Sequence, residues 1–151
     1  MSTLFDTNVL LRLVNKSAPL RPVALSAIRV LRTRNEPLHY TPQVLAEFWN
    51  VCTRPPSARG GFGLSPAETE RRARVIEHYL VLLPDNRATY REWRRLIVTH
   101  AVSGAAVHDA RLVASLKVYR ITALVTFNVD DFRRDQGNVL IAPQTLASQA
   151  P

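Results

Sequence analysis

The sequence predicts an α/β domain with a mostly parallel sheet of four to five short strands. Short apolar segments alternate along the chain with longer helical patterns, which is typical of strand–helix–strand units. Residues 121–127 (ITALVTF) form a continuous run rich in apolar and β-branched residues, as expected for a parallel strand covered on both faces. The 151 residues, of which 46% are hydrophobic, suit a single domain spanning 1–151.

The first part of the chain predicts two strands and two helices. Residues 3–5 read as a short buried strand, and a helix begins over residues 9–14. Pro19 and Pro22 stand where a second helix can begin, because the first turn of a helix tolerates proline. The apolar stripe of this helix consists of Val23, Ala27, Val30 and Leu31. Residues 38–40 are the candidate for the second strand.

Two clear helix starts frame a loop in the middle of the chain. Thr41 is a good N-cap and Pro42 suits the first helical position, so the segment QVLAEFWNVCTR is expected to be helical. Residues 55–64 (PPSARGGFGL) are rich in proline and glycine and predict a loop. Ser65 then begins a long helix, with Glu68 at the position of a capping box.

The second half continues the alternation. In order, the expected elements are a helix ending near residue 79, a strand within residues 79–84, a helix over residues 89–100, a helix from Ser103-Gly104 to Tyr119, the strand at residues 121–127 and a short strand at residues 138–142. Right-handed crossovers between parallel strands place helices on both faces of the sheet. Ligands of such folds bind beyond the carboxyl ends of the strands, so functional residues are sought there.

The charge of the chain favours a nucleic-acid partner. Its 20 Lys and Arg residues against 12 Asp and Glu residues give a net charge of +8, and its pI is about 10.7. Most of the positive charge is arginine, which binds phosphate with two parallel hydrogen bonds and stacks on bases. A small, basic, arginine-rich domain is typical of nucleic-acid binding, although solubility alone would also explain the charge.

The compartment and the absence of a membrane span are also expected from the sequence. The one cysteine, Cys52, excludes a disulfide within the chain, which fits a reducing compartment. Its apolar surroundings indicate a buried structural thiol. No segment approaches eighteen consecutive apolar residues, so no membrane span is expected. The N-terminus lacks a basic region followed by an apolar run, so cytoplasm is the expected location.

Three acids follow predicted strands. Asp6 comes directly after the first strand, and Asp130 and Asp131 closely follow the strand at residues 121–127. Taken singly, each position has an ordinary explanation. Asp6 is placed to cap the next helix, and the later pair can belong to a loop with an Asx turn at Asn128.

Two further acids lie among apolar residues in predicted helices. Glu47 has the apolar neighbours Val44, Phe48 and Val51. Asp109 precedes the apolar positions Leu112, Val113 and Leu116 at helical spacing. A paired structural Glu47 and a helix-dipole role for Asp109 are the ordinary alternatives, because a lone buried carboxylate costs several kcal/mol.

Taken together, these acids predict a metal site. Two carboxylates about 5–6 Å apart repel by roughly 3 kcal/mol at an effective dielectric constant near 20, so several of them at one sheet edge require a cation between them. Oxygen ligands select a hard divalent ion, Mg²⁺ or Mn²⁺. One cysteine and four scattered histidines form no zinc-binding pattern.

Four segments in this order resemble the PIN domain, and specifically the VapC-like toxins of bacterial toxin–antitoxin pairs. They are LFDTNVLLRL, QVLAEFWNVCTRP, VHDARLVAS and LVTFNVDDF, and the resemblance covers nearly the whole chain. It implies a three-layer α/β/α sandwich and a ribonuclease that depends on Mg²⁺ or Mn²⁺. It also implies a cognate antitoxin whose tail covers the acidic site, and a homodimer.

The resemblance assigns roles to individual residues. The family's acids fall on Asp6, Glu47, Asp109 and Asp131, which would act as metal ligands and catalytic residues. Asp131 is preferred to Asp130 because Phe132 follows it. The residues implied to support the site are Asn8, Thr126 and Asn128. One departure is the segment SGAAV before His108, where close relatives often carry a lysine.

The implied reaction is hydrolysis of RNA, in which either Asp109 or Glu47 orients or deprotonates the attacking water. Arg12, Arg54 and Arg59 are candidates for contacts to RNA phosphates, and single-stranded loops are the favoured target. The alternatives are a non-catalytic RNA-binding domain, a PIN nuclease with a housekeeping role in RNA processing and a degenerate nuclease that binds only an antitoxin. A phosphotransfer or haloacid-dehalogenase-like domain fits less well, because Asn8 stands where that chemistry requires a second Asp. A receiver domain requires an acidic pair before its first helix and a phosphorylated Asp at a later strand end, and neither pattern fits.

Overall fold

The computed structural model describes residues 1–132, 137 and 139–150 of the chain. In this part of the chain five strands form one sheet, β1 (Thr3–Phe5), β2 (Leu38–Tyr40), β3 (Val81–Leu82), β4 (Ala123–Val125) and β5 (Val139–Ile141). The helices are α1 (Thr7–Val14), α2 (Arg21–Thr33), α3 (Pro42–Thr53), α4 (Pro66–Tyr79), α5 (Arg87–Thr99), α6 (Ala106–Tyr119) and α7 (Pro143–Ala147), with a 3₁₀ turn η1 (Val129–Phe132). The alternation of strands and helices that the sequence predicts is confirmed.

The sheet has the order β3-β2-β1-β4-β5, and its strand pairs are parallel. The chain runs from β1 outwards through β2 to β3, and then crosses back to β4 beside β1. This reversal of direction lies between β1 and β4, and ligands of open parallel sheets bind at such a position. Asp6 follows β1 and Thr126 follows β4, so the sheet brings these two positions together.

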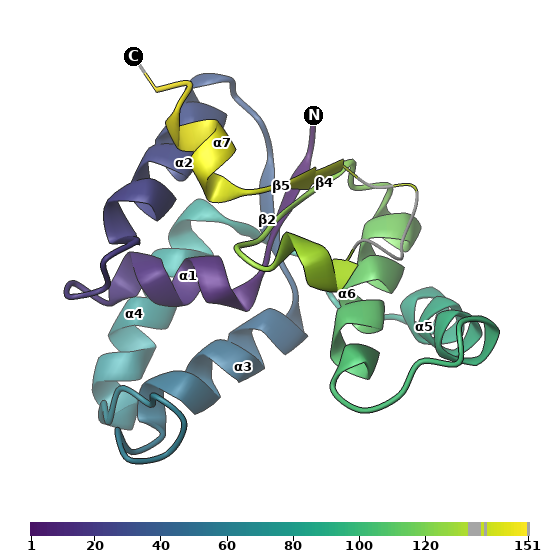
Figure 1. The fold of residues 1–151 in the computed structure, drawn as a ribbon, viewed down its shortest axis with the longest axis horizontal. Coiled ribbons are helices and arrows are strands. Elements are labelled where there is room, and N and C mark those ends of the chain that lie inside the picture. Colours follow the sequence, from purple (N-terminus) through teal and green to yellow (C-terminus); the bar gives the residue numbers. More distant parts are fainter. Residues whose placement is uncertain (133–136, 138, 151) are drawn as a thin grey trace.

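Helices cover the sheet on two sides, giving the expected three-layer α/β/α sandwich. Helices α1, α2, α4 and α7 lie to one side, and α5 and α6 lie together on the other (Figure 1). Helix α3 packs against α1 and α4. The central strands are fully covered, with Leu4, Phe5, Leu124 and Val125 each 0% exposed. Burial of such a side chain contributes about 1.5–3 kcal/mol, so the strands that carry the site rest on the best-packed part of the core.

Several boundaries differ from the predicted ones. Helix α1 begins at Thr7, two residues before the predicted start at Val9. The predicted strand at residues 121–127 is reduced to β4. The Thr126 N–H still donates to the Ile141 carbonyl of β5 at 3.1 Å, but its hydroxyl bonds to Asp6, and the Phe127 N–H donates to the Asn8 side chain of α1. Asn138, where the last strand was predicted to begin, lies outside the described residues. Helix α7 after β5 was not predicted.

The predicted capping box at the start of α4 is only half formed. The Ser65 side chain accepts a hydrogen bond from the Glu68 backbone N–H at 3.2 Å, as predicted. The Glu68 carboxylate does not return this bond, because it binds the guanidinium groups of Arg71 and Arg72 on the same helix. The two ion pairs lower the pKa of Glu68.

Candidate active site

One cleft of about 320 Å³ at the carboxyl edge of the sheet is lined by four carboxylates, and we call it the acidic cleft. Asp6 follows β1, Glu47 lies in the middle of α3, Asp109 lies in the first turn of α6, and Asp131 lies in η1. The other polar side chains that line it are Thr7, Asn8, Asn50 and Asn128. The fold thus brings together all four acids of the sequence prediction.

Asp6 occupies the cap position of α1 but does not cap the helix. Its side chain makes no cap hydrogen bond, so the ordinary explanation of this acid from the sequence is wrong. Its Oδ2 atom instead accepts hydrogen bonds of 2.7 Å from Thr126 Oγ1 and of 2.7 Å from Asn8 Nδ2. Burial raises the pKa of Asp6 and the bond from Thr126 opposes that increase.

Asn8 and Thr126 form the network beneath Asp6. Asn8 Nδ2 also donates to Thr126 Oγ1 at 3.0 Å, and Asn8 Oδ1 accepts from the Phe127 N–H at 3.1 Å. The Asn128 N–H donates to Thr126 Oγ1 at 3.0 Å, while the Asn128 residue is exposed in the cleft. Asn8 and Thr126 therefore contact Asp6 directly, whereas Asn128 contacts this network through its backbone.

Glu47 is held by two residues that sequence reasoning did not single out. Thr7 Oγ1 donates to Glu47 Oε2 at 2.8 Å, and Gln43 Nε2 donates to Glu47 Oε1 at 2.9 Å. Gln43 Nε2 also donates to the His108 backbone carbonyl at 3.0 Å, which ties α3 to α6. The signals were present in the sequence, because Gln43 lies one helical turn before Glu47 and Thr7 directly follows Asp6.

The pKa of Asp109 is raised well above its ordinary value of 3.8. Burial raises its pKa most, and the negative charges of the other three acids add to this effect, so that the pKa reaches about 6. The adjacent His108 lowers it. Asp109 accepts no hydrogen bond from another described residue, in contrast to Asp6 and Glu47. Its carboxylate is therefore open to a ligand.

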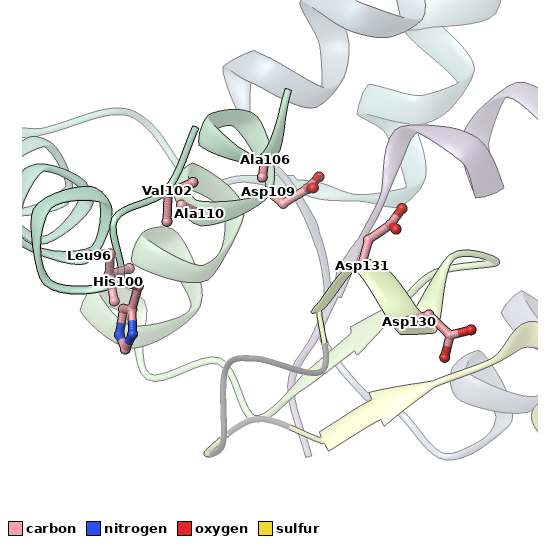
Figure 2. Close-up of a pocket in the computed structure, with 8 residues that line it drawn as sticks. All are labelled: Leu96, His100, Val102, Ala106, Asp109, Ala110, Asp130 and Asp131. Atoms are coloured by element: carbon pink, nitrogen blue, oxygen red, sulfur yellow. The ribbon is translucent and has the colours of Figure 1, made fainter. Parts of the chain in front are cut away.

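The structure distinguishes Asp131 from Asp130. Asp131 lines the acidic cleft and raises the pKa of Asp109, whereas Asp130 does neither. In Figure 2 Asp131 lies between Asp109 and Asp130, so Asp130 is the farther of the two from Asp109 in this view. Asp130 and Asp131 also line, together with Asp109, a smaller hollow of about 200 Å³ between η1 and the end of α5. The position of Asp131 agrees with the choice made from the sequence.

The acidic cleft holds excess negative charge. Within the described part of the chain no lysine or arginine forms an ion pair with any of its four acids. No three His, Cys, Asp or Glu side chains of the described residues are arranged so that they alone hold a metal ion. Mg²⁺ does not need such a cage, because it is usually bound by one or two carboxylates and several waters. The oxygen-only side chains and the unbalanced charge therefore fit a hard divalent cation.

The three arginines expected to contact RNA lie in two different places. Arg12 is one turn beyond Asn8 in α1, and its Nη1 atom donates to the Asn8 carbonyl at 2.7 Å. Arg54 and Arg59 lie in the loop after α3, where Arg54 Nη2 donates to the Arg59 carbonyl at 2.8 Å. None of the three arginines lines the acidic cleft itself, and their contact with RNA stays a prediction.

The sequence matches the family model of the PIN domain over residues 3–136. The chain belongs to the PIN domain family. PIN proteins are nucleases, and PIN nucleases generally use a divalent metal ion. Comparison of the sequence with curated proteins found no match. Among the described residues, no helix has both the length and the apolar character that crossing a membrane requires.

Solved structures support the same PIN fold. A chain of VapBC2 from Rickettsia felis, bound to a DNA fragment from its promoter, is 15% identical with a TM-score of 0.69, over 94% of this chain and 98% of that one. The Mycobacterium tuberculosis toxin VapC20, which cleaves the sarcin-ricin loop, is 17% identical with a TM-score of 0.61, over 82% and 87%. A toxin–antitoxin complex from Klebsiella pneumoniae is 20% identical with a TM-score of 0.64, over 94% and 98%.

Proposed function

We propose that this PIN domain is an endoribonuclease that hydrolyses RNA phosphodiester bonds with Mg²⁺ or Mn²⁺. The observation that carries the proposal is the acidic cleft, in which four carboxylates from four segments face one another without a basic partner among the described residues. The net charge of +8 agrees with a polyanionic substrate. The acidic cleft agrees with a divalent cation that lies between its carboxylates and this substrate.

The roles of the residues follow from their contacts. Asp6, Glu47, Asp109 and Asp131 would bind the metal, one or two of them directly and the others through its waters. The metal would lower the pKa of a bound water and stabilise charge on the phosphate. Glu47 has both carboxylate oxygens bonded, to Thr7 and to Gln43, which fixes its orientation. Asp109 has no such bond, so of the two acids it is the better candidate to orient the attacking water.

The test is cleavage of a single-stranded RNA with and without Mg²⁺. Wild-type protein should cut the RNA with Mg²⁺ or Mn²⁺ and stop in EDTA. Asp6→Asn and Asp109→Asn should each reduce the rate by at least about 100-fold, the usual scale for a lost catalytic group. Asp130→Asn is the matched control and should cut nearly as fast as wild type. Wild-type rates in both acid variants would show that the proposed site is wrong.

A non-catalytic RNA-binding domain is the main alternative. It would bind RNA with similar affinity in Mg²⁺ and in EDTA, and it would leave the RNA intact in both. The unbalanced acids of the cleft argue against it, because a surface that only binds phosphates gains nothing from four carboxylates.

We also propose that the nuclease is the toxin of a toxin–antitoxin pair in the cytoplasm, and that it forms a homodimer. The motif resemblance supports this role, and the solved relatives include such complexes. Growth arrest on expression, relieved by a small neighbouring gene, would support the toxin role over housekeeping RNA processing. Sedimentation of the purified protein would test the dimer.

An apolar groove offers a docking place for the antitoxin. It has a volume of about 300 Å³, lies between α1, α2 and α4, and is bordered by Arg21, Arg29 and Arg32. Tyr79 on its wall is 47% exposed and lies under the Arg32 guanidinium, 4.7 Å from the ring centre. An apolar groove with a basic border suits an amphipathic segment with acidic residues. Arg29→Glu with Arg32→Glu should weaken the complex and leave RNA cleavage by the free nuclease unchanged.

A further inference from the structure

Arg12 is held over an aromatic ring, one helical turn beyond the cleft residue Asn8. The guanidinium carbon of Arg12 lies 4.3 Å from the centre of the Phe127 ring. The 2.7 Å bond from Arg12 Nη1 to the Asn8 carbonyl holds the same group from a second side. A guanidinium fixed by a ring and a hydrogen bond loses little conformational freedom when it binds a ligand.

This pair is connected to the residues of the cleft. Asn8 lines the cleft, and its Oδ1 atom accepts the bond from the Phe127 N–H. Phe127 also lines a polar hollow of about 430 Å³ along residues 127–131. This hollow shares Asn128 and Asp131 with the acidic cleft. A chain that enters the cleft can therefore continue into the hollow beside Phe127.

The charge of Arg12 is available for a ligand. Within the described part of the chain Arg12 takes part in no ion pair, whereas Arg71, Arg74 and Arg95 each pair with a glutamate on their own helix. The neighbouring cleft is strongly acidic and repels phosphates. A polyanion next to it needs a fixed cation nearby.

We propose that Arg12 and Phe127 form a binding subsite for the nucleotide next to the cleaved bond. In this subsite the base stacks on the face of the Arg12 guanidinium that is turned away from Phe127. The inference rests on the proposed ribonuclease function and adds to it a residue pair that positions the substrate. Unpaired RNA bases stack on aromatic rings and on arginine planes, so single-stranded RNA is the substrate that this subsite selects.

The first test measures RNA binding in the Asp109→Asn protein, which removes cleavage from the measurement. Arg12→Gln and Arg12→Lys should both weaken the Kd for a short single-stranded RNA by at least about fivefold, the size of one stacking contact. Arg12→Lys keeps the charge, so the dependence of log Kd on log salt should stay as in the parent protein. Arg12→Gln should reduce that slope by about 0.7.

Arg21 provides the matched control. Its Nε atom also donates to a backbone carbonyl, that of Leu13, at 3.0 Å, but it lies on the apolar groove away from the acidic cleft. For each RNA position, we compare the affinity for an RNA that carries the base with the affinity for an RNA that lacks it. Arg21→Gln and Arg21→Lys should leave the ratio of these two affinities unchanged. Thermal unfolding of all four variants checks that each is folded.

The second test locates the stacked base with 2-aminopurine, whose fluorescence falls on stacking. We place it at each position of the RNA in turn. One position beside the cleavage site should be quenched by the parent protein and not by Arg12→Gln, Arg12→Lys or Phe127→Leu. Wild-type affinity and quenching in Arg12→Lys would reduce the role of Arg12 to charge and overturn the proposal. Quenching that is equal at all positions would overturn it as well.

These outcomes are independent of the proposed reaction. If the wild-type protein cuts RNA while the Arg12 variants bind and cut normally, the subsite is wrong and the ribonuclease stands. If no RNA is cut but one base is still quenched through Arg12, the reaction is wrong while the nucleotide subsite stands. With an active enzyme, Arg12→Gln should raise KM at least about fivefold and leave kcat nearly unchanged, because the acids are intact.

Discussion

The hydroxyl of Thr126 donates a 2.7 Å hydrogen bond to Oδ2 of Asp6, which lies 120 residues earlier in the chain. The two residues follow the neighbouring parallel strands β4 and β1, whose last residues Val125 and Phe5 are in register. The Asp6 N–H also donates to the Val125 carbonyl at 3.0 Å. The carboxylate at the centre of the acidic cleft is thus held where the strand order of the sheet reverses.

Replacement of Thr126 should weaken both the site and the fold. Thr126→Val keeps the shape of a side chain that is 0% exposed but removes a bond to a carboxylate, which costs about 1–3 kcal/mol of unfolding free energy. It should also raise the pKa of Asp6 further, because this bond lowers it. More Mg²⁺ should then be needed for half-maximal cleavage. Urea unfolding and Mg²⁺ titration measure the two effects.

Thr122→Val is the control for this change. Thr122 lies just before β4 and donates to the Ser2 carbonyl at 3.0 Å, but it is exposed and far from the carboxyl edge. Thr122→Val should leave the Mg²⁺ requirement unchanged, and it should change the free energy of unfolding by no more than about 0.5 kcal/mol. Equal Mg²⁺ requirements for Thr126→Val and wild type would contradict the role of Thr126.

The raised pKa of Asp109 predicts how stability depends on pH without metal. Its pKa rises from 3.8 to about 6 in the folded chain. Between these values the unfolded chain has lost the proton that the folded chain keeps, so stability falls as pH rises through this window. In EDTA, Asp109→Asn should therefore be more stable than wild type at pH 7, with a difference that decreases towards pH 4. Thermal unfolding from pH 4.5 to 7.5 measures this difference.

Mg²⁺ provides the complementary measurement. It should raise the melting temperature of wild type at pH 7 and have a much smaller effect on Asp109→Asn, because the ion binds the charged form of this acid. A stability difference between the two proteins that does not change with pH would show that the pKa of Asp109 is not raised. Glu68 and Glu92 have lowered pKa values, but they are common to both proteins and their effects cancel.

Gln43 should matter for activity although it is not an acid. It joins Glu47 to the His108 carbonyl, and its residue is 7% exposed. Gln43→Leu leaves Glu47 with one donor fewer, so we expect a loss of about 1–2 kcal/mol of stability and a drop in kcat larger than the change in KM. Gln144→Leu on the exposed side of α7 is the matched control. An unchanged kcat for Gln43→Leu would exclude a positioning role.

Two glycines of the loop after α3 should respond differently to alanine. A Cβ at Gly61 would stand 2.2 Å from the Arg54 carbonyl oxygen, whereas a Cβ at Gly60 meets nothing within 4 Å. Gly60 has φ of +68°, so Gly60→Ala should cost about 1–2 kcal/mol. Gly61→Ala should cost more, about 3 kcal/mol, because backbone must move. Urea unfolding compares them, and equal losses would contradict the close backbone approach.

Much of the fold was predictable from local patterns. The order of strands and helices follows from the apolar runs and from cap residues such as Thr41, Ser65 and Pro66, whose effects act within a few residues. The end of β4 was not predictable in this way. Thr126 and Phe127 are good strand residues, but the Thr126 hydroxyl bonds to Asp6 and the Phe127 N–H donates to the Asn8 side chain of α1. Tertiary contacts override strand propensity at these positions.

The sequence by itself determined the fold class, the basic charge and the four acids, because spacing and composition are properties of the chain alone. Only the tertiary structure decided that Asp6 is a buried acceptor and not a helix cap. It also decided that Thr7 and Gln43 hold Glu47, and that Arg12 lies over Phe127. The reason is physical: these contacts join residues on different elements, and their distances depend on how the sheet and helices pack.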